Sequence, residues 1–139
     1  MATLHVDIVS AEGAIFSGEA SMVFAPAEMG EVGIAPRHAP LLTRLKPGTV
    51  RVKNGSEEQP FYVSGGILEI QPHLVTVLAD SALRAKDADE AAALAAKKSA
   101  EERLAGAKSD IDLARVQAEL VEAAARLKFV QDLQRTNHH

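Results

Sequence analysis

Residues 63–80 read VSGGILEIQPHLVTVLAD, and this stretch decides the fold. It holds two short runs of mainly branched apolar residues, 67–70 and 75–78, with Gly65-Gly66 ahead of the first run and Pro72 between the two. Branched apolar side chains favour extended backbone, and short runs bounded by Gly and Pro are typical of strands. The stretch therefore predicts two β-strands separated by a turn.

The same pattern extends back to the N-terminus. Leu4, Val6 and Ile8 alternate with His5 and Asp7, which is the period of a strand with one buried face. Further short apolar runs follow at 22–24, 50–52 and 61–63. Short strands at this spacing, separated by Gly, Pro and Asn, predict an antiparallel β-sandwich or barrel.

Two features predict how these strands are connected. Asn54-Gly55 predicts a tight hairpin, because both residues tolerate the positive φ that such a turn needs. Pro36, Pro40 and Pro47 indicate that the segment 34–49 is an ordered connection rather than a central strand, since proline cannot donate to a sheet ladder.

The composition changes abruptly near Lys86. Gly and Pro almost vanish, and Ala, Glu, Lys, Arg and Leu take over. This shift divides the chain into a β domain, 1–84, and a helical domain, 85–139.

The first helix is expected to begin near Asp87 or Asp89, whose carboxylates can accept hydrogen bonds from free N–H groups. It should run to about Ala105, and Gly106 should end it in a left-handed conformation. The short link that follows favours an antiparallel two-helix hairpin.

Ser109 or Asp110 is expected to cap the second helix. Its apolar residues follow alternating three- and four-residue steps, which is a heptad seam: Leu113, Val116, Leu120, Ala123, Leu127 and Val130. The first helix offers little more than Leu94, Leu104 and alanines. Because burying a methyl group contributes only about 0.8 kcal/mol, the hairpin is weakly held by itself. It is either a mechanical switch or a static cover for one sheet.

Composition excludes several classes of site. The chain has no cysteine, so disulfides, thiolate metal sites and a cysteine nucleophile are absent. The formal net charge is -4 and no basic block occurs, which disfavours a nucleic-acid partner. No basic leader and no long apolar run is seen, so we expect neither a signal peptide nor a membrane span.

No catalytic constellation is found. His5 and His73 lack carboxylates at a metal-ligand spacing, and the terminal pair His138-His139 is typical of a tail or an expression remnant. Residues 30–33, GEVG, lack the Lys and Ser or Thr of a phosphate loop. We therefore expect no catalytic residue, no metal site and no enzyme activity in this chain alone.

Several long strings then point to one family. Residues 63–72 and 75–80 resemble the signature of the bacterial F-type ATP synthase ε subunit, as does GIAPRHAPLLT at 33–43. FSG at 16–18 and the GEVG turn at 30–33 occur in the expected order. The resemblance covers essentially the whole chain.

This resemblance implies a flattened sandwich of about ten strands followed by a helix–loop–helix. It also implies a non-catalytic rotor role in the central stalk, with the γ subunit, the ring of c subunits, and the α and β subunits as partners. Such a subunit would lie at the cytoplasmic face of the bacterial inner membrane, held there through the complex. By the matching motif, Glu31 would face the c ring, and Ser10, His38 and Thr43 would lie on the surface used against γ.

The helical hairpin would then regulate the motor. We expect the helices to dock compactly on the sandwich in one state and to extend along γ into the catalytic head in another, which would block rotation and inhibit ATP hydrolysis. Arg126, Lys128 and Arg135 would then meet acidic surface on the β subunit, a contact weakened by salt.

The chain departs from the family pattern in two places. Arg37 stands where a glycine is usual, so if this backbone has positive φ the arginine is strained by about 1 kcal/mol. In the nucleotide-binding motif of some relatives, Asp89 is retained, but Ala92 replaces the arginine that would pair with phosphate. We therefore expect weak or absent ATP binding, and no cofactor.

Without the resemblance, the residues alone leave other classes open. The main alternative is a free-standing β-sandwich binding module that dimerises through its helices, although the seam is short for an autonomous coiled coil. A nucleotide sensor is disfavoured by Ala92. An enzyme is the most remote class.

Overall fold

The computed structural model of this chain describes residues 2–137. It divides into two compact units, Met1–Lys86 and Asp87–His139. The first unit is built from strands and the second from helices, and each is described by itself below. The division lies two residues beyond the expected one after Arg84.

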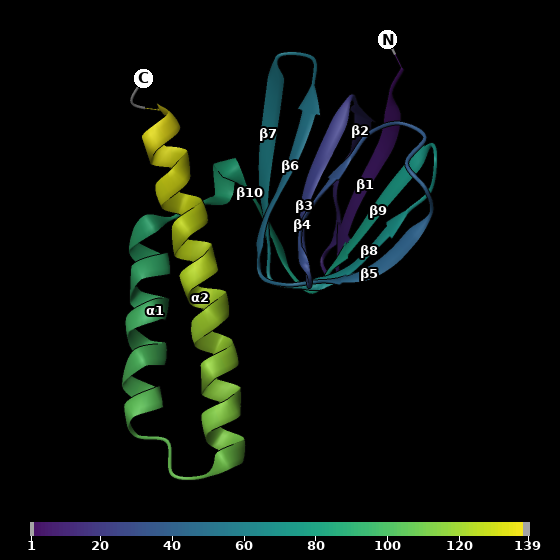
Figure 1. The fold of residues 1–139 in the computed structure, drawn as a ribbon. Coiled ribbons are helices and arrows are strands. Elements are labelled where there is room, and N and C mark those ends of the chain that lie inside the picture. Colours follow the sequence, from purple (N-terminus) through teal and green to yellow (C-terminus); the bar gives the residue numbers. More distant parts are fainter. Residues whose placement is uncertain (1, 138–139) are drawn as a thin grey trace. The chain divides into compact units, whose positions relative to one another are not determined.

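The first unit contains ten strands (Figure 1). In chain order they are β1 (Leu4–Ser10), β2 (Gly13–Ala20), β3 (Met22–Ala27), β4 (Gly30–Ile34), β5 (Leu41–Leu45), β6 (Gly48–Asn54), β7 (Glu57–Val63), β8 (Gly66–Ile70), β9 (Leu74–Ala79) and β10 (Ala82–Arg84). They join side by side in the order β10-β7-β6-β3-β5-β8-β9-β1-β2, and β4 pairs with β3. The expected sandwich of about ten strands is confirmed.

The pairing is antiparallel with one exception. β1 and β9 run parallel, with Val6 opposite Val75 and Ile8 opposite Val77. The strands curl over so that β10 and β2, the two ends of the order, lie close together. Arg84 Nε on β10 donates to the Ile15 carbonyl oxygen on β2 at 3.0 Å.

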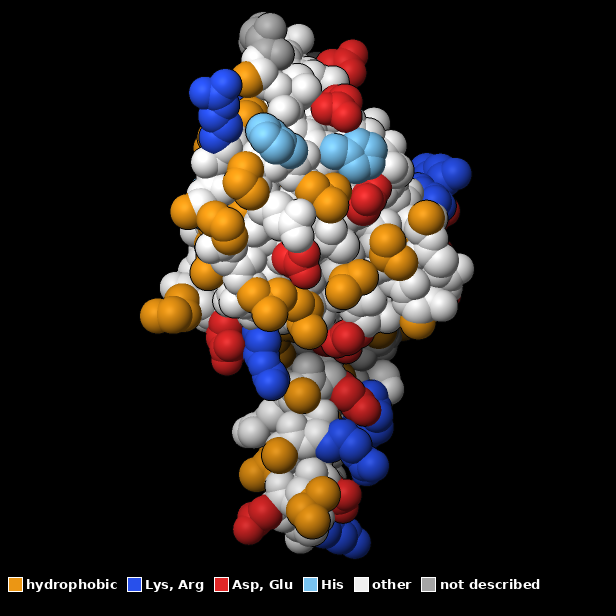
Figure 2. Space-filling model, turned by 90° about the vertical axis from the view of Figure 1, so that its right-hand side faces the viewer, with side chains coloured by type: hydrophobic (Ala, Val, Ile, Leu, Met, Phe, Trp, Pro, Cys, Tyr) orange, Lys and Arg blue, Asp and Glu red, His pale blue; other side chains and the backbone are white. Residues whose placement is uncertain are grey.

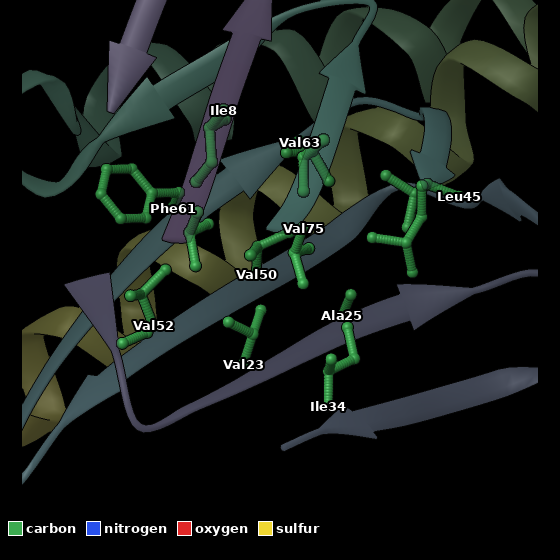
Figure 3. Packing of buried hydrophobic residues seen from close by; sticks show 14 of the residues in the cluster. Ile8, Val23, Ala25, Ile34, Leu45, Val50, Val52, Phe61, Val63 and Val75 are labelled. Atoms are coloured by element: carbon green, nitrogen blue, oxygen red, sulfur yellow. The ribbon is translucent and has the colours of Figure 1, made fainter. Parts of the chain in front are cut away.

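The core lies between the two layers of the sandwich and consists mainly of branched aliphatic side chains. Figure 3 shows these side chains pointing toward one another from strands of both layers. The alternation predicted for the first strand is confirmed, because Leu4, Val6 and Ile8 are each at most 1% exposed. The larger rings Phe16 and Phe61 lie 5.2 Å apart, centroid to centroid. Burial of this set is the main stabilising contribution to the unit.

Two predictions about the connections need correction. The hairpin at Asn54-Gly55 is present, but Asn54 still pairs with Glu57, so the two turn residues are Gly55 and Ser56. Only Gly55 of these has positive φ, 65°, as in two-residue hairpin turns with glycine in the first position. The segment 34–49 contains a central strand, β5, which pairs with β8 and β3.

The prolines of that segment do not prevent a central strand because of where they lie. Pro40 immediately precedes β5, and Pro47 follows it before β6 begins. Neither proline occupies a position inside the strand, so no ladder hydrogen bond is lost.

A short 3₁₀ turn, Ala85–Asp87, spans the boundary between the units, and the second unit contains α1 (Glu90–Ala105) and α2 (Asp110–Asn137). Asp89 caps α1, and its carboxylate accepts from the Ala92 N–H at 3.2 Å. Ser109 caps α2, because its hydroxyl accepts from the Asp112 N–H at 3.1 Å. The left-handed ending expected at Gly106 is wrong: its φ is −97°, and its N–H donates back to the Arg103 carbonyl.

The two helices run antiparallel beside each other (Figure 1). On α2, Val116, Ala123, Leu127 and Val130 of the predicted seam are buried. On α1 the buried residues are alanines, Ala93 and Ala100. The expected contribution of Leu94 is wrong, since this side chain is 47% exposed. Arg103 Nη1 on α1 pairs with Glu119 Oε2 on α2 at 2.6 Å, which adds one ion pair to a small apolar interface.

Candidate functional site

An apolar strip crosses the outer face of four strands in the first unit. We define it as Val9 on β1, Leu78 on β9, Ile67 on β8 and Leu42 on β5. Ile67 lies directly opposite Leu78, and Leu78 lies directly opposite Val9. Leu42, Ile67 and Leu78 are 68%, 45% and 48% exposed. Hydrophobic side chains gather on this face (Figure 2).

The strip exists because β5, β8, β9 and β1 alternate between core and outer face. Leu68 and Val77 point into the core, which turns their neighbours Ile67 and Leu78 outward. Solvated strand faces normally carry polar residues at such positions. Leu42 lies opposite Glu69, so it neighbours Ile67 only along a diagonal. An exposed apolar patch of this kind is typical of a surface that binds another protein.

A polar cluster borders the strip: it consists of His5 and Asp7 on β1, Ser17 and Glu19 on β2, and Thr3 just before β1. His5 Nδ1 lies 3.2 Å from Glu19 Oε1, and His5 Nε2 lies 3.0 Å from Asp7 Oδ1. The hydrogen bonds to Glu19 first and Asp7 second raise the pKa of His5 above its ordinary value. The bond to His5, with a smaller contribution from Thr3, lowers the pKa of Glu19. The imidazolium form can donate to both carboxylates, so this cluster favours a charged His5.

Glu31 lies at the start of β4, next to the β3–β4 turn. The turn residue Met29 is 99% exposed, and Gly30 has a φ of 132° that suits glycine. The Glu31 side chain is 56% exposed, and its Oε1 accepts from Arg51 Nη2 at 3.2 Å. The turn therefore presents an apolar tip and a carboxylate that binds Arg51 on β6, on the far side of β3.

The three residues predicted to contact γ do not lie on the apolar strip. Ser10 is 8% exposed, and its hydroxyl accepts from the Glu12 N–H in the β1–β2 turn. Thr43 is half-buried and lies opposite the buried Leu68. His38 is half-buried in the β4–β5 connection, where its Nδ1 donates to the Ala39 carbonyl at 2.7 Å. Their contact with a partner stays a prediction.

The basic residues predicted to contact β all lie on the C-terminal half of α2. Arg135 Nη2 donates to Asp132 Oδ1 at 2.6 Å. Lys128 is exposed and Arg126 is half-buried.

No metal site is assembled in the part of the chain that the structure describes. Within residues 2–137, no three His, Asp or Glu side chains gather as metal ligands do. The Asp89 carboxylate is occupied as the cap of α1, and Ala92 beside it supplies no cation. His138 and His139 lie outside the described residues. Neither α1 nor α2, over these residues, has the length and apolarity of a membrane-crossing helix.

Comparison with known proteins decides the family. Residues 3–85 match the family model of the ATP synthase delta/epsilon chain β-sandwich domain, and residues 82–131 match that of its long α-helix domain. The ATP synthase epsilon chain of Nitrosococcus oceani is 64% identical over 134 residues, covering 96% of each chain. This chain belongs to the ATP synthase epsilon chain family. The epsilon chain of Alkalilimnicola ehrlichii is 63% identical over 136 residues, covering 97% of each chain.

Solved structures share the fold of this epsilon-family chain. A chain of the Euglena gracilis mitochondrial ATP synthase, in an OSCP/F1/c-ring structure, superposes with a TM-score of 0.77 at 15% identity, over 100% of this chain and 83% of that one. A chain of the Tetrahymena thermophila mitochondrial ATP synthase, in a central stalk/c-ring structure, superposes with a TM-score of 0.66 at 12% identity, over 91% of this chain and 96% of that one. With its bacterial relatives named epsilon chains, the protein is a subunit of an ATP synthase and not an enzyme by itself.

The sequence pattern did not indicate that the strip, Met29 or Arg51 belongs to a functional surface. Alternation along each strand indicates which residues point outward, but not which strands lie side by side. β5 meets β8, and β1 meets β9, only through connections that the pattern does not reveal. Arg51 was missed because its partners come from three other strands.

Proposed function

We propose that this chain is a rotor subunit in the central stalk of a bacterial proton-translocating ATP synthase. In this role it couples proton flow to ATP synthesis, and its helices restrain ATP hydrolysis. It acts at the cytoplasmic face of the inner membrane, attached through its partners. The observation that carries the proposal is the exposed apolar strip on a rigid sheet of a chain that belongs to the epsilon family.

The strip supports docking on the γ subunit. Apolar side chains on packed strands lose little conformational entropy on binding, so their burial adds to affinity. The polar cluster borders the strip, in the way that a polar rim surrounds the core of a protein interface. Ser10, His38 and Thr43 are proposed as further γ contacts.

The test of γ docking is co-purification with a tagged γ subunit. Ile67→Asp places a charge in the strip and should weaken binding about 10- to 100-fold, as for a residue at an interface centre. Met29→Asp changes an exposed apolar side chain outside the strip and should leave γ binding unchanged. If the chain is not retained by γ, or if both variants bind as the unmodified chain does, the proposed docking surface is wrong.

Glu31 and the β3–β4 turn are proposed to contact the polar loops of the c ring. The turn is narrow, its carboxylate is more than half exposed, and Met29 extends beyond it. Glu31→Gln should weaken binding to a γ–c-ring assembly while leaving binding to γ alone unchanged. Equal binding of Glu31→Gln to the assembly would contradict this contact.

The helical unit is proposed to inhibit ATP hydrolysis by extending from its compact hairpin. The α1 side of the hairpin supports this, because its buried residues are Ala93 and Ala100, and burying an alanine methyl contributes only about 0.8 kcal/mol. A chain that ends at Lys86 should raise the ATPase activity of the reconstituted enzyme. Unchanged hydrolysis would contradict an inhibitory role.

Arg126, Lys128 and Arg135 are proposed to contact the β subunit when the helices extend. Arg135→Glu has a matched control in Arg115→Glu, because each arginine pairs with an aspartate three residues earlier on α2. The first variant should relieve inhibition and the second should not. Equal effects of the two variants would indicate a general change in helix charge instead of a specific contact.

Nucleotide binding by the helical unit is proposed to be weak or absent. Asp89 is engaged as a helix cap, and Ala92 provides no positive charge for phosphate. Calorimetric titration of the full chain with ATP should show no binding at micromolar concentrations. A micromolar dissociation constant would overturn this expectation.

A further inference from the structure

Arg51 on β6 joins three other strands on the outer face of its layer. Its guanidinium carbon lies 4.3 Å from the centroid of the Phe24 ring on β3. Its Nη2 donates to Glu31 Oε1 on β4 at 3.2 Å, and its Nη1 donates to Glu58 Oε1 on β7 at 3.0 Å. One planar group therefore stacks on a ring and binds carboxylates from two separate hairpins.

The strand register builds this arrangement. Phe24 lies directly opposite Arg51, so the ring and the guanidinium meet across neighbouring strands. Gly33 lies opposite Phe24 on the other side, and a Cβ there would come within 3.4 Å of the ring and 3.2 Å of Met22 Cε. The glycine thus leaves room for the ring on which Arg51 stacks.

The contacts restrict Glu31 without covering it. A single exposed ion pair holds a side chain weakly, but stacking on Phe24 and pairing with Glu58 fix the guanidinium before it meets Glu31. The Arg51 side chain is 36% exposed, whereas that of Glu31 is 56% exposed. Glu31 therefore remains accessible to a partner while Arg51 engages one of its oxygen atoms.

We propose that Arg51 is a positioning residue for Glu31. It holds the carboxylate in one orientation beside the β3–β4 turn and so strengthens the contact of this turn with the c ring. The inference rests on the proposed function, which assigns Glu31 to that contact. A pre-oriented side chain loses less conformational entropy when the partner binds, and this effect corresponds to about a two- to tenfold change in affinity.

The test measures the affinity of the full chain for a γ–c-ring assembly and for γ alone. Arg51→Gln should bind the assembly about two- to tenfold more weakly and bind γ alone unchanged. Arg51→Lys keeps the positive charge but not the planar guanidinium with its two donor nitrogens, so its affinity for the assembly should lie between that of the unmodified chain and that of Arg51→Gln. In the Glu31→Gln background, Arg51→Gln should cause no further loss, because the carboxylate that Arg51 positions is gone.

Glu58→Gln is the matched control. It removes the other carboxylate of the same guanidinium and leaves the pair with Glu31, so its effect should be smaller than that of Arg51→Gln.

Different outcomes overturn different statements. If Glu31→Gln weakens binding but Arg51→Gln adds an equal loss in both backgrounds, the positioning role is wrong and the c-ring contact stands. If Arg51→Gln weakens binding to γ alone as much as to the assembly, Arg51 merely supports the fold, and the inference fails. If Glu31→Gln binds the assembly normally, the proposed contact fails and the inference fails with it.

Discussion

Replacing Arg37 by glycine should stabilise the sandwich. Arg37 has a φ of 70°, the positive φ that non-glycine residues rarely adopt. It follows Pro36 in a turn closed by the His38 N–H, which donates to the Ala35 carbonyl at 3.1 Å. Proline followed by a residue of positive φ is the pattern of a type II turn, whose second central residue is normally glycine.

The magnitude follows from two opposing terms. The left-handed conformation costs an L-residue about 1–2 kcal/mol. Glycine removes that strain but gives the unfolded chain more freedom, which costs about 0.4–1 kcal/mol. The Arg37 N–H also donates to the Pro72 carbonyl at 2.8 Å, so the turn is held in place and cannot relax around the arginine. The net gain for Arg37→Gly is about 1 kcal/mol, or about 4–8 °C in Tm for a unit of this size.

The assay is thermal unfolding followed by tyrosine fluorescence. The chain has one tyrosine and no tryptophan, and Tyr62 lies in β7 of the sandwich, so the signal reports on that unit. Arg37→Ala keeps the strain and removes the side chain, and should leave Tm unchanged. Ser56→Gly, at a turn position without positive φ, should lower it. A Tm for Arg37→Gly at or below that of the unmodified chain would refute the strain argument.

Three further outcomes are expected. Gly66→Ala should prevent folding or lower the free energy of unfolding by several kcal/mol, because the φ of Gly66 is 138° and a Cβ there would overlap a backbone carbonyl of β9. Gly55 has open space around it, so Gly55→Ala should lower the free energy of unfolding by only about 1–2 kcal/mol, from its positive φ. Urea unfolding of the two variants compares these effects. The pKa of His5 measured by NMR should lie above 6.5 and should fall in the Glu19→Gln variant. Because the pKa of His5 is raised in the folded chain, its contribution to stability is full below pH 6.5 and is lost as the pH rises through the folded pKa. Ser109→Ala should cost about 1 kcal/mol and fray the start of α2, seen as faster amide exchange there.

The sequence predicted the elements that depend on local chemistry. Alternation along the first strand predicted that Leu4, Val6 and Ile8 lie in the core, as they do. Asp89 and Ser109, which were among the predicted cap residues, cap α1 and α2. The positive φ considered for Arg37 is also observed. In each case the deciding interaction lies within a few residues along the chain.

The features that the sequence did not reveal depend on contacts between distant segments. β5 forms between two prolines because β3 and β8 supply its hydrogen bonds. The parallel pair of β1 and β9 aligns Val9 with Leu78. Such outcomes are set by tertiary pairing, which a periodic pattern cannot specify.

The most direct test of the account is the accessibility of the apolar strip in the γ complex. The chain has no cysteine, so Leu78→Cys introduces a unique thiol at a position that is 48% exposed. The account predicts rapid maleimide labelling in the free chain and strong protection when γ is bound, while a thiol at the exposed Gln59 on β7 stays reactive in both. Equal labelling of Leu78→Cys with and without γ would contradict the claim that this face binds the γ subunit.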